Sequence, residues 1–351
     1  MKTMPKIKLL LYRFFSTYLG KLILQLLSFG VAVKNLGNAK KQKKHHFIVA
    51  ITIDTESGYV SKGERRVWQK ENPKAFQGYY SGIRNLLKLF DKHKIKTAFF
   101  LSTQCFSSKG DEHKKIMEEI GDAIKKWHEI GLHLHPDSDF SLQKKLGRKF
   151  NATSAFFYNY EEKFRIIKAA RELIKENLGK NIEKNLISFR WGNWALDTEG
   201  AMALDRLGFK IDSSATPGIK GHAHDAMKYD WSRVKKHYPW KLSVKDYEAT
   251  AHNDSGIMEI PIATFDFFGM TLRADPVNSI LLNKAFMEYH RNADRSEKPF
   301  VFVVITHSSE ATYSDGRPTK ALEDLDGFIS LAKKHNDVEF CTLYEAYQRL
   351  E

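Results

Sequence analysis

The sequence has few cysteines and no long uncharged hydrophobic run. Only Cys105 and Cys341 occur among 351 residues, and each lies inside an apolar segment. Buried, reduced thiols explain such a pair, so nothing points to a disulfide-stapled fold. The uncharged run 22–33 is shorter than the roughly 20 residues that a helix needs to cross a bilayer. The chain also shows no internal repeat or low-complexity tract, which excludes a repeat protein.

Acidic residues are missing from positions 1–46, where ten lysines and arginines occur. Ten of the fourteen excess positive charges therefore lie there, and the remainder is only mildly basic. Residues 1–45 also contain the apolar runs LLLYRFF and LILQLLSFGVAV, a combination that favours an interfacial helix on an anionic membrane surface. No nucleic-acid-binding module is recognisable, so we expect no nucleic-acid partner.

The side of the membrane stays open on sequence alone. A solvated arm is one alternative, and a signal peptide is another, although no clear cleavage pattern follows the apolar run. Basic residues flank that run on both sides, so charge gives no firm orientation. We expect a cytoplasmic protein or one on the cytoplasmic face of a membrane, with export left open.

The rest of the chain, residues 46–351, alternates short apolar runs with segments of helical periodicity. This alternation predicts βαβ units with a parallel sheet in one domain, and the number of repeats predicts an α/β fold that is a closed or nearly closed barrel. The helical segments are 79–94, 111–130, 164–179, 198–208 and 321–336, and the strands are 46–53, 95–102, 129–135, 186–191, 208–214, 257–262, 300–307 and 338–343.

Polar residues stand where several of these strands end, which is where β/α barrels gather their chemistry. The first strand ends in AITIDTES, in which Asp54 and Glu56 are two residues apart and so share one face. Two carboxylates side by side repel each other unless a cation or a shared proton relieves them. A solvated strand end is the simpler alternative for this motif alone.

The third strand ends in GLHLHPD, which places His133 and His135 on one face. Two imidazoles and one carboxylate are three protein ligands, and they leave a position open, as catalytic metal sites require. His307 ends a very hydrophobic strand and has the titration range of a general acid, and Arg190 in FRWGNW is suited to hold a carboxylate.

The ordered motifs IDTES, GLHLHPD, FRWGNW, GFKIDSSATPG and ITHSSE resemble those of the NodB-homology polysaccharide deacetylases, carbohydrate esterase family 4. The resemblance covers about residues 46–345, and it implies a distorted barrel of seven or eight strands and metal-dependent removal of an N-acetyl group from a sugar. It implies that Asp54 is the catalytic base, His133 a metal ligand, Arg190 the residue that holds the base and His307 the acid. Asp212 lies in the segment whose acidic residue orients the acid.

Two motifs depart from the family pattern. Thr55 stands where the family has its metal-binding aspartate, so Glu56 is the expected ligand, as in members with a D-x-E motif. The usual histidine spacing would put Asp137 in the second slot, but strand geometry favours His135. With these departures, the motifs resemble those of family members associated with lipopolysaccharide or capsule biosynthesis.

The sequence therefore predicts a hydrolase in which Glu56, His133 and His135 hold Zn²⁺, or else Co²⁺ or Mn²⁺, and whose partner is an N-acetylated glycan. The long segment 216–256 is expected to be a loop, in which Trp231 and Trp240 either contact sugar rings or pack over the barrel. The altered first motif leaves one alternative from another class, a catalytically inactive, membrane-associated glycan-binding scaffold.

Overall fold

The computed structural model describes residues 23, 30–32, 47–68, 71–72, 75–221, 228–235, 237–252, 255–293 and 300–351. The predicted interfacial helix of residues 1–45 lies almost entirely outside this set. Within it, β1 (Val31–Ala32) pairs antiparallel with β13 (Thr264–Phe267), which in turn pairs with β14 (Met270–Arg273). The end of the arm is therefore attached to the main domain. No helix among the described residues is long and apolar enough to cross a membrane.

The core of the fold is a curled sheet of parallel strands, as predicted. All eight strands expected from the apolar runs are present, some of them shorter than expected. In sheet order they are β12 (Met258–Glu259), β8 (Ile211–Asp212), β7 (Ser188–Trp191), β6 (Glu129–Leu134), β5 (Ala98–Ser102), β2 (Phe47–Thr55) and β15 (Val301–His307), with β16 (Val338–Phe340) also on β2.

Strand β2 organises the sheet because three strands pair with it. Strand β15 runs beside its whole length, from Val301 opposite Ile48 to His307 opposite Asp54. The other edge is divided, with β16 along 47–49 and β5 along 52–55. A bridge between Ile262 and Val303 joins the segment after β12 to β15 and closes the ring. The sheet is thus a distorted barrel.

The barrel interior is filled by apolar side chains that alternate along the strands, as the two-residue period of a strand requires. Ile48, Ala50 and Phe100 belong to this cluster together with Val303 and Ile305. Leu343 and Ala346 of α11 (Leu343–Leu350) complete it. The Tyr344 amide donates to Glu129, the first residue of β6, at 2.8 Å, so α11 covers the amino end of the barrel.

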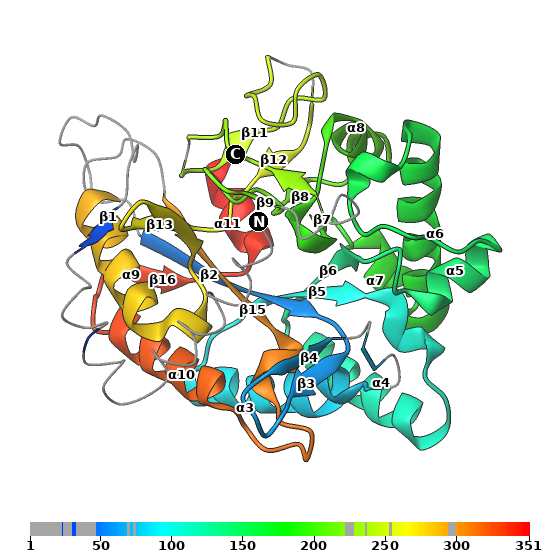
Figure 1. The fold of residues 1–351 in the computed structure, drawn as a ribbon, viewed down its shortest axis with the longest axis horizontal. Coiled ribbons are helices and arrows are strands. Elements are labelled where there is room, and N and C mark those ends of the chain that lie inside the picture. Colours follow the sequence, from blue (N-terminus) through cyan, green and yellow to red (C-terminus); the bar gives the residue numbers. More distant parts are fainter. Residues whose placement is uncertain are drawn as a thin grey trace.

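Helices lie along the outside of the barrel (Figure 1). The five predicted helical segments correspond to α3 (Ile83–His93), α4 (Gly110–Lys125), α6 (Tyr160–Leu178), α8 (Thr198–Arg206) and α10 (Lys320–Ala332). Four more helices of the described chain were not predicted: α5 (Phe140–Leu146), α7 (Lys180–Lys184), α9 (Ser279–Ala293) and α11. Leu281, Leu282, Ala285, Phe286 and Tyr289 form the buried face of α9.

The described residues of the segment 216–256 form three short strands: β9 (Lys220–Gly221), β10 (Tyr229–Asp230) and β11 (Trp240–Lys241). Trp231 and Trp240 are both buried, and the Trp231 indole donates to the Trp194 carbonyl at 2.8 Å. Packing over the barrel, and not contact with sugar, is therefore the role that the structure supports for these two tryptophans. Cys105 and Cys341 are buried free thiols, as expected.

Candidate metal centre and its catalytic groups

The carboxyl ends of four strands, β7, β6, β2 and β15, bring the predicted site residues together on both sides of β5. Asp54 is opposite His307 in the pairing of β2 with β15, and His133 is opposite Arg190 in the pairing of β6 with β7. Glu56 and His135 follow β2 and β6 by one residue each. All six side chains are buried, and Arg190 is completely buried.

The predicted ligands Glu56, His133 and His135 form a compact donor set, with one ligand atom of each within 4.8 Å of the others. The Nε2 atoms of His133 and His135 are 3.0 Å apart, and Nε2 of His135 is 3.3 Å from Oε2 of Glu56. The carbonyl of Arg190 lies 3.0 Å from Nδ1 of His133. An N–H at Nδ1 directs the lone pair at Nε2 towards the other two ligands.

These residues fit a divalent ion. Two nitrogens bound at 2.0–2.1 Å in tetrahedral geometry would be separated by roughly 3.3 Å, close to the separation of the two Nε2 atoms. Oε2 of Glu56 is buried and accepts no hydrogen bond from the residues that the structure describes, which is costly for a carboxylate oxygen unless a cation is present. Asp137, the alternative second ligand, instead accepts a hydrogen bond from Thr153 at 2.5 Å.

Two glycines allow this close packing around the ligands. A Cβ at Gly78, in the π-helical turn Gly78–Gly82, would stand 2.3 Å from the carbonyl oxygen of Glu56. A Cβ at Gly192 would stand 2.8 Å from the ring of His135. Any other residue at either position would displace a candidate ligand.

Asp54 is held in one orientation by Arg190. Nη1 of Arg190 donates to Oδ1 at 2.7 Å, while its other nitrogens donate to Thr52 and Ser213. Burial raises the pKa of Asp54, but the positive charges of Arg190 and of the nearby histidines outweigh it and hold the pKa far below its usual value. The second oxygen, Oδ2, lies 3.9 Å from His133 and 3.8 Å from His307, so it faces the centre.

His307 has a carboxylate partner that the sequence did not reveal. Oε2 of Glu310 lies 3.0 Å from Nδ1 of His307, and the His307 amide donates to the same oxygen at 3.1 Å. Burial and Arg66 lower the pKa of His307, but Glu310 outweighs them, so the pKa is raised above its ordinary value. Arg66 contacts both Glu56 and Glu310, and it thereby links the ligand set to the His307 pair.

Asp212 lies deeper in the barrel than expected from its predicted role. It accepts hydrogen bonds from the amide and hydroxyl of Ser214 at 3.0 and 2.8 Å. It also faces Glu259 across the pairing of β8 with β12, and burial raises the pKa of both carboxyl groups. Among the described residues, Glu310 and not Asp212 is the carboxylate at Nδ1 of His307. A catalytic role for Asp212 therefore stays a prediction.

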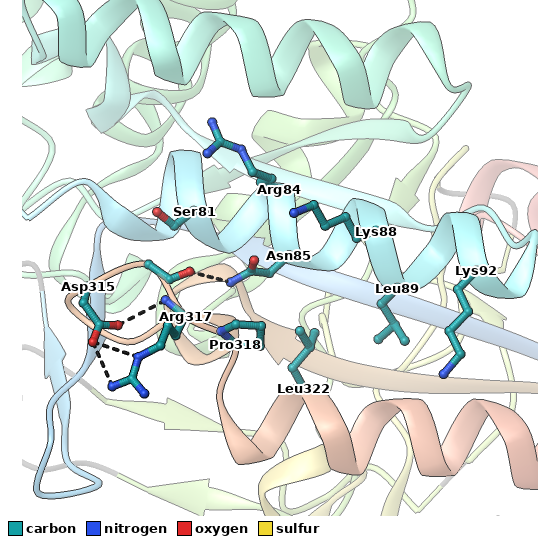
Figure 2. Close-up of a pocket in the computed structure, with 11 residues that line it drawn as sticks. Ser81, Arg84, Asn85, Lys88, Leu89, Lys92, Asp315, Arg317, Pro318 and Leu322 are labelled. Atoms are coloured by element: carbon teal, nitrogen blue, oxygen red, sulfur yellow. Dashed lines mark hydrogen bonds and ion pairs between the residues drawn. The ribbon is translucent and has the colours of Figure 1, made fainter.

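A separate cleft between α3 and α10 contains none of these residues (Figure 2). Two of its cations are paired, Lys92 with Asp326 at 2.5 Å and Arg317 with Asp315 at 2.9 Å. Asn85 on its wall donates to the carbonyls of Ala311 and Gly316 at 3.0 and 3.2 Å. The cleft thus borders the segment that follows Glu310, and the hydrogen bonds of Asn85 hold the backbone of that segment in place.

Comparison with known proteins supports the fold. No family model matches the sequence, and no curated protein matches it. Among solved structures, a protein named as a polysaccharide deacetylase from Mycobacterium smegmatis superposes with a TM-score of 0.57 and 17% identity, over 91% of this chain and 94% of that one.

Two further structures are similar to the same extent. A protein named as a polysaccharide deacetylase from Pseudomonas aeruginosa PAO1 gives a TM-score of 0.55 at 14% identity, over 87% of this chain and 91% of its own. The allantoinase PuuE gives 0.56 at 15% identity, over 90% and 94%. The chain therefore has the distorted barrel fold of the NodB-type polysaccharide deacetylases.

Proposed function

We propose that this protein is a metal-dependent hydrolase that removes an N-acetyl or other N-acyl group from an amino sugar. One observation carries the proposal: Oδ2 of Asp54 lies between a candidate metal ligand, His133, and a candidate acid, His307, at 3.9 and 3.8 Å. A base, an acid and a ligand set at one strand end are what hydrolysis of an amide requires. The fold shared with polysaccharide deacetylases supports a carbohydrate amide as the substrate.

Asp54 serves as the base towards the attacking water. Arg190 engages Oδ1, which leaves Oδ2 free to accept the proton. Because its pKa is held far below the usual value, Asp54 stays ionised throughout the working pH range. The buried guanidinium also fixes the carboxylate plane, which keeps the water in line with the acyl carbon.

His307 serves as the acid towards the leaving amine. Glu310 occupies Nδ1, so the proton available for transfer is at Nε2, on the side of Asp54. The raised pKa keeps the imidazole protonated near neutral pH, as proton donation requires.

Glu56, His133 and His135 would hold the divalent ion, with Zn²⁺ favoured over Co²⁺ or Mn²⁺. When bound, the ion supplies Lewis-acid polarisation of the acyl carbonyl. Arg66 contacts Glu56 from the side of Glu310 and so holds its carboxylate in place within the ligand set.

The substrate is expected to be a cell-surface polysaccharide or its precursor, in keeping with the D-x-E motif that is similar to lipopolysaccharide and capsule members. Trp68 is the candidate contact for the sugar ring. Its side chain is 44% exposed, lies edge-on to His307 with ring centres 6.4 Å apart, and is covered on one face by Arg66 at 3.8 Å. The basic arm would bring the enzyme to an anionic membrane that carries such a precursor.

The test measures, on the purified full chain, bound metal, acetate release from a panel of N-acetylated oligosaccharides, and ring opening of allantoin. Asp54→Asn should lower kcat by about 10²–10⁴-fold while metal content stays unchanged. His133→Ala should lose activity and the ion held by Glu56, His133 and His135. His93 lies at the end of α3, and its imidazole pairs with Asp326 of α10, so His93→Ala is the matched control and should lose neither that ion nor activity.

Two results would reject the proposal. A wild-type chain that is metal-free under non-chelating conditions, yet binds glycan without releasing acetate, would identify the inactive glycan-binding scaffold instead. Ring opening of allantoin without action on any glycan would move the substrate class to cyclic ureides.

A further inference from the structure

A second group of metal-ligating side chains lies at the opposite, amino end of the barrel. His290 is in the last turn of α9, His335 follows α10, and Asp337 precedes β16. One ligand atom of each lies within 4.8 Å of the other two. Figure 1 shows α9, α10 and β16 on the same side of the molecule. None of these residues takes part in the centre at the carboxyl end.

The group contains a second imidazole in addition to the ion pair of His290 with Asp337. Nε2 of His290 is 3.1 and 3.0 Å from the two oxygens of Asp337. The ring of His335 lies 4.4 Å from that of His290, centre to centre. Elsewhere in this chain a histidine–aspartate pair, His93 with Asp326, is completed by the lysine Lys92. At Asp337 the third member is a second imidazole, which, unlike an ammonium group, is able to bind a metal.

The surroundings favour a cation. His290 lies where α9 ends and His335 three residues beyond the end of α10, and the carbonyls at a helix C-terminus carry partial negative charge. Both imidazoles also pack against Phe286, with ring centres 5.8 and 5.7 Å away. Apolar packing on one side of the imidazoles limits their contact with water there and strengthens electrostatic attraction to a bound ion.

The backbone of Asp337 is also fixed in place by the barrel. The backbone carbonyl of Asp337 accepts the amide of Phe47, the first residue of β2, at 2.9 Å. The side chains of His290 and Asp337 are only 16% and 33% exposed, so the group is preformed and still open to solvent.

We propose that His290, His335 and Asp337 bind a second divalent transition-metal ion such as Zn²⁺, which ties the ends of α9 and α10 to the start of β2. Two imidazole nitrogens and a carboxylate oxygen are a donor set that Zn²⁺ and its neighbours accept. The inference does not rest on the proposed function, because this site lies at the other end of the barrel.

The test counts ions on the chelator-stripped full chain after incubation with Zn²⁺ and removal of excess metal, by mass spectrometry. His133→Ala, which loses the candidate catalytic centre, should retain one ion per chain. The double variant His133→Ala/His335→Ala should retain none. His133→Ala/His93→Ala is the matched control, because it removes the other histidine–aspartate pair and should keep the ion.

A second measurement guards against misfolding of the double variant. Zn²⁺ should raise the Tm of His133→Ala and leave the Tm of His133→Ala/His335→Asn unchanged, with equal circular dichroism for both. Retention of no ion by His133→Ala would overturn the proposal, and so would an equal ion count in His133→Ala and its His335 variant. Either result would leave the hydrolase proposal untouched.

Discussion

At the scale of single residues, the position of Glu310 sets the pKa and the orientation of the candidate acid, His307. The carboxylate lies three residues after His307 in one turn of 3-10 helix (Ser308–Ala311) and bonds both the ring and the backbone amide of His307. Its own pKa is lowered to about 2, since the positive charges of His307 and Arg66 outweigh its burial. Glu310 therefore stays ionised while His307 titrates.

Substitution of Glu310 by Gln tests this pairing. A group whose pKa is raised in the protein stays protonated to higher pH, so loss of the carboxylate should lower the pKa of His307 and move the alkaline limb of the kcat profile to lower pH. We expect about a tenfold loss of kcat at pH 8. Glu323→Gln on the exposed face of α10 is the control and should keep the wild-type profile.

Unchanged metal content would show that the effect of Glu310→Gln comes through His307. An alkaline limb in the same place as in the wild type would argue that Glu310 has no influence on the acid.

His128 offers a second residue-scale test, of stability. Its side chain is buried, and the Thr97 amide donates to its Nδ1 at 3.2 Å. Burial lowers its pKa from 6.5 to about 4. As the pH falls, His128 of the unfolded chain is protonated before His128 of the folded protein. Its contribution to the free energy of unfolding is therefore complete above pH 6.5 and falls by about 3 kcal/mol as the pH drops towards 4.

The measurement is urea unfolding of the wild type and of His128→Asn between pH 4 and 8. The wild type should lose its advantage over the variant as the pH falls through this window. Parallel pH dependence of the two proteins would contradict the assignment.

The predicted site residues could be found from sequence because each ends or directly follows an apolar strand. Asp54, Glu56, His133, His135, Arg190 and His307 all obey this rule. Arg66 and Glu310 do not, since they lie in a hairpin and a turn, and only tertiary folding brings them together.

At the scale of elements, the hairpin β3 (Gly58–Val60) and β4 (Arg66–Trp68) belongs to the site although it is not part of the barrel. It leaves the barrel just after Glu56, and its second strand places Arg66 against Glu310 and Trp68 against His307. A sugar whose amine reaches Nε2 of His307 would therefore lie beside the exposed part of the indole.

Substitution of Trp68 by Ala should raise KM for the glycan about tenfold with little change in kcat, because it removes an apolar platform and no proton-transfer group. Trp68→Phe should restore most of the binding. Trp127→Ala is the control, since this tryptophan is 77% exposed and contacts Lys96 instead. A loss confined to kcat would reject the platform.

Strands and helices were predicted correctly where a periodic pattern extends over many residues. They were missed where tertiary contacts determine the secondary structure. The eight strands and five helices were found because burial on one or both faces leaves a periodic pattern. The hairpin strands β3, β4, β13 and β14 are only three or four residues long, so they offer no measurable period. Helix α9 does carry a helical period, so its sequence was sufficient to predict it, and the failure to predict it was an error.

At the scale of the whole molecule, charge is divided between the arm and the barrel. The basic arm predicts binding of the full chain to vesicles that contain anionic lipid, with no binding to zwitterionic ones. Deletion of residues 1–29 removes five cations and leaves β1 in its sheet, so it should weaken binding at least tenfold without altering Tm.

Cosedimentation at low and at physiological salt is the measurement. Binding of the shortened chain equal to that of the full chain would show that the arm is not the membrane contact.

The barrel is closed at its amino end by residues 338–351, since Cys341 and α11 cover Ile48, Ala50 and Val303 there. During synthesis those interior side chains consequently remain uncovered until residues 338–351 have left the ribosome. A nascent chain that has already formed β2, β5 and β15 would display an apolar barrel mouth of the kind that chaperones bind. Emergence of residues 338–351, rather than assembly of the preceding strands, is then the step that commits the barrel to its folded state.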